Sequence, residues 1–90
     1  MTRELVWQLP GERASIREVE IQIYDEGELL KREVLSYPAG LSFDIVQKMS
    51  LRDGQYPARV FVRREGRTEN IYSPTIHVGS EETITVIPDN

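Results

Sequence analysis

The sequence LRDGQYPARVFVR, residues 51–63, contains a tight turn followed by the clearest strand of the chain. Asp53 and Gly54 form the turn pair, because glycine adopts positive φ angles without a steric penalty. One set of alternating side chains after the turn suits a core: Tyr56, Ala58, Val60 and Val62. The other set suits solvent: Pro57, Arg59, Phe61 and Arg63. A period of two is typical of a strand with one buried face, so we predict a half-buried strand over residues 55–63.

The rest of the chain divides into similar short segments separated by turn residues. We predict strands over residues 4–9, 16–24, 29–37, 41–45 (fading over 46–50), 68–78 and 83–87. In the first two, the faces expected to be buried carry Leu5, Trp7 and Leu9, and Val19, Ile21 and Ile23. A hairpin loop with Gly27 at a left-handed position should join the second and third strands. Pro74 interrupts the sixth segment and should lie at an edge, a bulge or a switch between sheets.

The segment 29–37 has no clear phase, because apolar residues occur on both of its faces. A bulge near Lys31 and Arg32 would bring apolar residues from both sets inward. A helix is the competing interpretation, since residues 28–35 are rich in helix formers. Gly27 and Pro38 bound the segment closely and favour a strand.

Seven short strands spaced by roughly ten residues, with turn signals between them, are typical of an antiparallel β-sandwich. We therefore predict an all-β fold in which residues 1–90 form a single antiparallel sandwich domain of about seven strands. A small barrel is the alternative.

Composition excludes several classes of function. The 90 residues include 15 acids and 11 bases, for a net charge of −4, which argues against a nucleic-acid partner. The absence of cysteine excludes disulfides, thiol nucleophiles and thiolate metal sites. We find neither an apolar run long enough for a membrane helix nor a signal peptide, so no membrane insertion is expected. If the chain is full length we expect a cytoplasmic protein, and if it is an excised domain, a periplasmic or extracellular one.

Residues 51–56 resemble the tyrosine corner of immunoglobulin-like and fibronectin type III-like sandwiches, with Tyr56 two residues after a turn glycine. The resemblance implies that the Tyr56 hydroxyl bonds back to the turn backbone. Residues 19–30, together with Pro38 and the turn before Tyr56, are also similar to bacterial flagellar hook-cap and secretion-sorting Ig-like domains. The chain departs from antibody domains in having no cysteine, and Ala58 stands at the second cysteine position. The resemblance implies a bacterial sandwich and no active site.

No catalytic or metal-binding constellation emerges from the residues. His77 is the only histidine, and its neighbours Ile76 and Val78 place it on an outward face. Carboxylates are frequent, but we interpret them as a solvated surface: Glu18, Glu20, Glu26 and Glu28. The loop acids Asp25 and Asp53 match no calcium-loop spacing. We therefore predict no catalytic residue, no metal, no cofactor and no enzyme activity.

The candidate binding face follows from the expected hairpin at residues 64–67. If Arg64 pairs with Arg67, then Phe61 lies opposite Asn70, Arg59 opposite Tyr72, and Val60 opposite Ile71 in the core. The outward side then carries Arg59, Phe61, Arg63 and Tyr72. Exposed aromatics beside arginines are enriched in protein interfaces. The same set could instead be a surface cation–π stack, or a platform for a sugar or a base.

We therefore expect a non-catalytic module for protein–protein interaction or structural support, with a protein partner or self-association. A carbohydrate- or small-ligand-binding module of the same fold is the alternative, with these aromatic candidates: Trp7, Tyr24, Tyr37 and Phe61. Trp7 falls on the face expected to be buried. A sandwich edge could also accept a partner strand, although Pro74 and the charges of residues 63–69 would blunt one edge.

Overall fold

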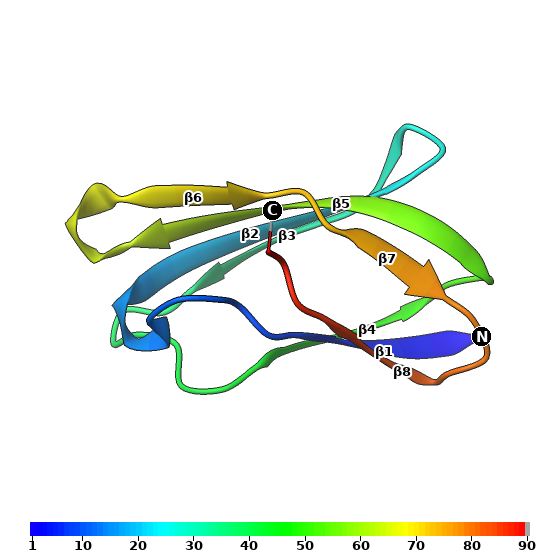
Figure 1. Ribbon diagram of the computed structural model, residues 1–90, viewed down its shortest axis with the longest axis horizontal. Helices are drawn as coiled ribbons and strands as arrows, with labels where there is room; N and C mark the ends of the chain where they lie inside the picture. Colours follow the sequence, from blue (N-terminus) through cyan, green and yellow to red (C-terminus); the bar gives the residue numbers. More distant parts are fainter. Residues whose placement is uncertain (90) are drawn as a thin grey trace.

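The computed structural model describes the backbone of residues 1–89 and, apart from Arg67, their side chains. Eight strands in this part of the chain form two facing sheets (Figure 1). The strands are β1 (Thr2–Trp7), β2 (Ile16–Asp25), β3 (Glu28–Ser36), β4 (Ile45–Ser50), β5 (Gly54–Arg64), β6 (Glu69–Tyr72), β7 (Thr75–Val78) and β8 (Thr83–Val86). Two 3₁₀ turns, η1 (Arg13–Ser15) and η2 (Glu65–Arg67), complete them. No helix in residues 1–89 has the length and apolar character needed to span a bilayer.

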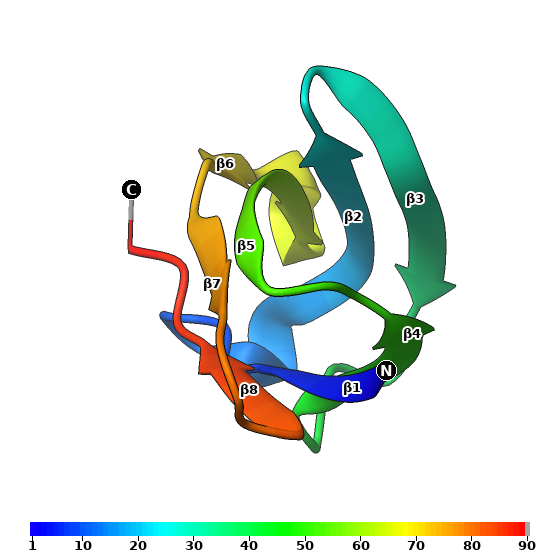
Figure 2. The same ribbon diagram turned by 90° about the vertical axis from the view of Figure 1, so that its right-hand side faces the viewer.

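The two sheets differ in composition and direction. A three-stranded sheet has the order β4-β1-β8, and a five-stranded antiparallel sheet has the order β3-β2-β5-β6, with β7 also paired to β5. Viewed along the strands, the sheets form two layers around a common interior (Figure 2). The all-β, two-sheet prediction is confirmed. The prediction of purely antiparallel pairing is wrong, because β8 runs parallel to β1.

Eighteen buried apolar side chains form one core between the sheets. Leu5, Trp7 and Leu9 point inward from β1 and the residue pair that follows it, as predicted. The predicted inward face of β2 is also buried, with Val19, Ile21 and Ile23 all at 0% exposure. The Trp7 indole is fully buried and donates a hydrogen bond from Nε1 to Gln47 Oε1 at 2.8 Å.

The stretch before β5 is held from two sides. The Tyr56 hydroxyl donates to the Arg52 carbonyl at 2.7 Å, which is the backbone contact expected of a tyrosine corner. The buried guanidinium of Arg3 donates to the Leu51 carbonyl at 3.3 Å, to Asp53 Oδ1 at 2.8 Å and to the Glu81 carbonyl at 2.7 Å. Arg3 therefore ties β1 to the turn before β5 and to the loop between β7 and β8.

The fourth strand begins where the sequence predicted that it would fade. Residues 41–44 form a loop in which Phe43 is 81% exposed, and β4 starts only at Ile45. The inward position in the middle of β4 is occupied by Gln47. Its amide accepts from Trp7 and donates to Glu33 Oε1 at 2.7 Å, so this buried polar side chain has partners on both sides. The alternation of Leu41 and Phe43 therefore indicated a strand where there is none.

The segment 28–36 is a strand, as favoured over a helix, but of its apolar residues only Leu35 packs against the core. Tyr24 pairs with Leu29 and Ile23 pairs with Lys31, so Leu30 is the bulged residue. The expected bulge is therefore one position from the predicted site. It does not bury the apolar residues: Leu29, Leu30 and Val34 are 52%, 45% and 45% exposed.

Ser73 and Pro74 separate β6 from β7 at one side of the five-stranded sheet. Val60 pairs with Tyr72 before the break and Pro57 pairs with Thr75 after it, so no residue is inserted. The Pro74 carbonyl accepts from the Ala58 amide at 2.9 Å. Pro74 therefore lies at an edge, one of the positions predicted for it.

Candidate functional site

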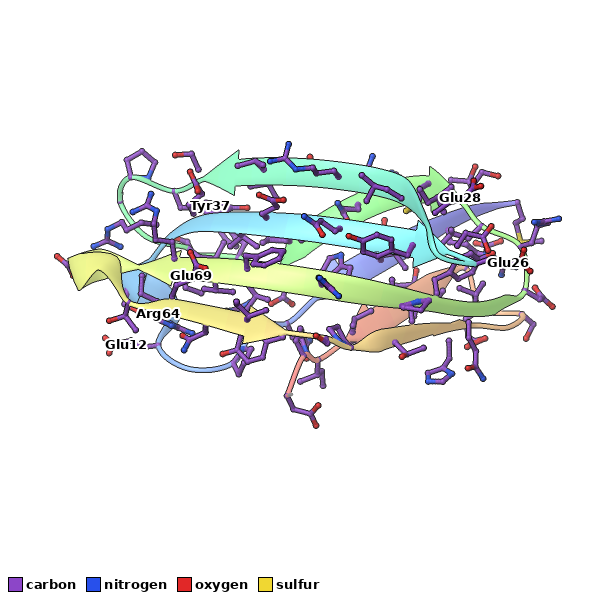
Figure 3. The ribbon with its side chains drawn as sticks, turned by 90° about the horizontal axis from the view of Figure 1, so that it is seen from above. Glu12, Glu26, Glu28, Tyr37, Arg64 and Glu69 are labelled. Atoms are coloured by element: carbon purple, nitrogen blue, oxygen red, sulfur yellow. The ribbon has the colours of Figure 1, made fainter. Side chains whose placement is uncertain are left out.

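The candidate site is the outer face of the five-stranded sheet, the side turned away from the core. Figure 3 views this face, with β3, β2, β5 and β6 crossing it in that order. Glu26 and Glu28 mark its end at the β2–β3 turn, and Glu69 and Arg64 mark the opposite end. Its exposed positions alternate with core positions along each strand, which is the consequence of a period of two.

The register between β5 and β6 differs from the predicted one. Arg64 bonds through its amide to the Thr68 carbonyl at 2.7 Å, so the loop contains the three residues of η2. Gly66 takes a φ of 81° in the middle of this loop, a conformation that favours glycine. As a result Phe61 lies opposite Ile71, and Val60 opposite Tyr72. A shift of one residue moves every β6 side chain to the other face of the sheet.

The shift of one residue changes which β6 side chain lies on the predicted face. Arg59, Phe61 and Arg63 lie on the outer side, as expected, but Tyr72 packs against the core and does not join them. Ile71 takes its place beside Phe61 and is 57% exposed. Gly66 fits a two-residue turn as well as a three-residue loop, so the sequence alone did not distinguish Ile71 from Tyr72.

A row of directly opposed residues crosses the face from one edge to the other. Val34 lies opposite Glu20, Glu20 opposite Phe61, and Phe61 opposite Ile71. The ends of this row expose apolar side chains, and Leu29 and Leu30 expose further ones on β3 beyond Arg32. Four of the eight large exposed apolar side chains of the described chain therefore lie on one sheet: Leu29, Leu30, Val34 and Ile71.

The acid in this row is neutralised by its own neighbours. Glu20 accepts from Arg32 Nε at 2.8 Å and from Arg32 Nη2 at 3.2 Å, a bidentate pair. Gln22 donates a further bond to Glu20 Oε2 at 2.6 Å. The Arg32 hydrogen bonds, followed by that from Gln22, lower the pKa of the Glu20 carboxyl, and the same pairing raises the pKa of Arg32.

The two arginines of β5 on this face, Arg59 and Arg63, form fewer polar contacts than Arg32 does. Arg63 Nε lies 3.9 Å from Glu18 Oε1, and both side chains are about half exposed. Arg59 forms no ion pair or hydrogen bond with any other described side chain. A shallow hollow of about 210 Å³ over Phe61 is lined by Glu18, Glu20, Phe61, Arg63 and Glu69. A larger hollow of about 460 Å³ lies next to it and is lined by Tyr24, Gly27, Pro57, Ala58, Arg59, Ser73, Pro74 and Thr75.

The residues considered for acid–base or metal chemistry lie apart. His77 is exposed on β7 opposite Gln55. Asp25 faces Arg52 at 3.9 Å and Asp53 pairs with Arg3 at 2.8 Å, so each of these loop acids has a cation for a neighbour. Nowhere in residues 1–89 do three histidine, aspartate or glutamate side chains gather closely enough to hold a metal ion.

Comparison of the chain with protein families, with curated protein sequences and with solved structures found no match.

Proposed function

We propose that this chain is a non-catalytic β-sandwich module that binds another protein through the outer face of its five-stranded sheet. The observation that carries the proposal is the row from Val34 to Ile71, which displays apolar side chains beside arginines on the outer face of the sheet. Apolar contacts flanked by arginine are enriched at protein interfaces.

The proposal extends to an immunoglobulin-like architecture. Its support is the Tyr56 hydroxyl bonded to the backbone four residues upstream, at the start of the strand that occupies the centre of the larger sheet. The buried Trp7 on the facing sheet agrees with a sandwich core. Two features depart from that architecture: β8 runs parallel to β1, and the first strand lies in the middle of a three-stranded sheet.

A double substitution, Phe61→Ser with Ile71→Ser, tests the proposed face. Proteins captured from the source cell by the unmodified chain should be lost from the variant, while its thermal unfolding stays cooperative. The matched control is Val46→Ser on the other sheet, because the 52% exposure of Val46 is close to the 57% of Ile71. Equal capture by the double variant and the unmodified chain would assign binding to another surface.

Binding of a carbohydrate or another small ligand is the second candidate, and the hollow beside Arg59 favours it. This hollow brings together an aromatic ring (Tyr24), two prolines and Arg59, which bonds to no side chain among those that the structure describes. Trp7 is buried and cannot form part of such a platform. Titration with a panel of sugars, followed by NMR, would show shifts at Tyr24 and Arg59 if the hollow is a binding site, and none if it is not.

A further inference from the structure

Strand β3 leaves one long edge of the five-stranded sheet open. Its nine residues pair with β2 on one side, and none of the other described strands pairs with its second side. Figure 3 shows β3 as the outermost strand of the face. A row of unpaired backbone donors and acceptors of this length is a template for another strand.

The side chains along this edge alternate in a way that restricts which strand can join it. Leu30, Arg32 and Val34 lie on the exposed side, whereas Lys31 and Glu33 point toward the space between the sheets. Inward-pointing charges on an edge strand reject a partner that has no matching charges, because those charges would be buried without a counter-ion. A strand that does fit must place an acid opposite Lys31 and a base opposite Glu33.

A second copy of the same strand meets this requirement. We propose that two copies of the chain associate by antiparallel pairing of their β3 strands around a two-fold axis at Arg32, so that two five-stranded sheets become one continuous sheet. In this register Lys31 lies opposite Glu33 of the second copy, and the symmetry repeats the ion pair. Leu30 lies opposite Val34 of the second copy, and this apolar pair is also repeated. The interface is isologous, as a closed dimer requires.

The neighbouring registers are unfavourable. An axis at Lys31 places two lysines opposite each other and sets Leu30 against Arg32. An axis at Glu33 places two glutamates opposite each other and sets Lys31 against Leu35. Like charges directly opposite across strands are destabilising, so the axis at Arg32 is selected.

The axis at Arg32 places the two Arg32 side chains opposite each other, but each of them forms an ion pair with Glu20 of its own chain. The bidentate contact with Glu20, at 2.8 and 3.2 Å, neutralises the guanidinium within its own chain. Lys31, in contrast, has no ion-pair partner among the described residues of its own chain. Among the described residues, Glu33 is bonded only by the Gln47 amide, at its Oε1 atom, and Oε2 is available to a lysine. In the dimer, Lys31 of each copy therefore pairs with Glu33 of the other copy.

Charge reversal at these two positions tests the pairing by sedimentation equilibrium over a concentration series. The unmodified chain should shift from 10.4 kDa toward twice that mass as concentration rises. Lys31→Glu alone, and Glu33→Lys alone, should each weaken dimerisation by about tenfold or more, because each places like charges opposite each other twice. An equimolar mixture of the two single variants should regain dimers, since position 31 of each variant then faces an opposite charge at position 33 of the other. Glu82→Lys, in the exposed loop between β7 and β8, is the control and should leave the dimer intact.

The outcomes separate this inference, which concerns the β3 edge and goes beyond the proposed function, from the proposed function of the outer face. A monomer at every concentration would overturn the β3 pairing and leave the inward charges as protection against foreign strands. A dimer that survives Lys31→Glu would also overturn it. Loss of capture in the Phe61 and Ile71 variant tests the outer face and is independent of both results. Circular dichroism of each single variant shows whether it is folded, and restored dimers in the mixture require that both are.

Discussion

At the scale of single residues, the turn before β5 is held by hydrogen bonds from two buried side chains, Tyr56 and Arg3. Tyr56 is 5% exposed and its hydroxyl reaches the Arg52 carbonyl, while Arg3, at 3% exposure, bonds the carbonyl of Leu51 and the carboxylate of Asp53. These bonds fix the path of the chain where it crosses from the smaller sheet to the larger one. A buried carbonyl that loses its donor retains the cost of its desolvation.

Tyr56→Phe removes only the hydroxyl and should lower the free energy of unfolding by about 1–2 kcal/mol, because the Arg52 carbonyl loses a partly buried donor. Urea denaturation gives this value directly. Tyr72→Phe is the matched control, since the Tyr72 hydroxyl bonds to no other described side chain, and it should change stability by less than about 0.5 kcal/mol. Equal effects of the two substitutions would contradict the structural role of the Tyr56 hydroxyl.

At the scale of strands, the register of β6 decides which of two neighbouring side chains supports the core. Tyr72→Ser should cost about 2 kcal/mol of stability, because a partly buried aromatic ring is removed from the core. Ile71→Ser should cost less than about 0.5 kcal/mol, since Ile71 projects into solvent. The predicted register, with Ile71 in the core, requires the opposite order, so a pair of thermal melts distinguishes the two.

Strands with an uninterrupted apolar alternation were predictable from sequence, and strands with polar residues in the interior were not. β1, β2 and β5 keep a clean period of two, and their predicted faces are buried. In β4 Gln47 occupies the interior position. Its burial depends on hydrogen bonds with Trp7 and Glu33, which both lie far from it in the sequence. In β3 the inward charges Lys31 and Glu33 conceal the phase in the same way.

In the candidate site, the positions within one strand were predictable from sequence and the neighbour across the hairpin was not. Arg59, Phe61 and Arg63 were placed correctly because they share one strand and one period. Their cross-strand neighbour was placed wrongly because it depends on the number of residues in the hairpin loop, and a difference of one residue exchanges Tyr72 for Ile71. The partner of β8 was equally hidden, since periodicity carries no information about which strand lies alongside.

At the scale of the whole molecule, stability should fall at both ends of the pH range. Hydrogen bonds from Arg32 and Gln22 lower the pKa of Glu20 below 4.5, so its stabilisation is present above that value and is lost as pH falls through the lower folded pKa. Burial, with the charge of Glu33, raises the pKa of the Tyr37 hydroxyl above 10.0. The contribution of neutral Tyr37 to the free energy of unfolding is therefore present below pH 10.0 and is lost as pH rises through the folded pKa. Urea denaturation across the pH range should show both losses.

Two substitutions assign these losses to their groups. Glu20→Gln should reduce the loss on the acid side and leave the alkaline side unchanged, whereas Tyr37→Phe should do the reverse. Glu26→Gln, at the exposed β2–β3 turn, is the control and should alter neither. An acid-side loss of unchanged size in Glu20→Gln would assign it to other carboxylates.

The parallel pairing of β1 with β8 determines how the molecule responds to a stretching force. The first strand and the last strand lie side by side, with residues 4–7 in register with residues 83–86. A pull on the chain before β1 and after β8 therefore drives the two strands past each other in shear. Their hydrogen bonds lie across the direction of the force and must break together, whereas a hairpin pulled from its open end yields one bond at a time. The fold thus has the geometry of a link that carries tension along its strands.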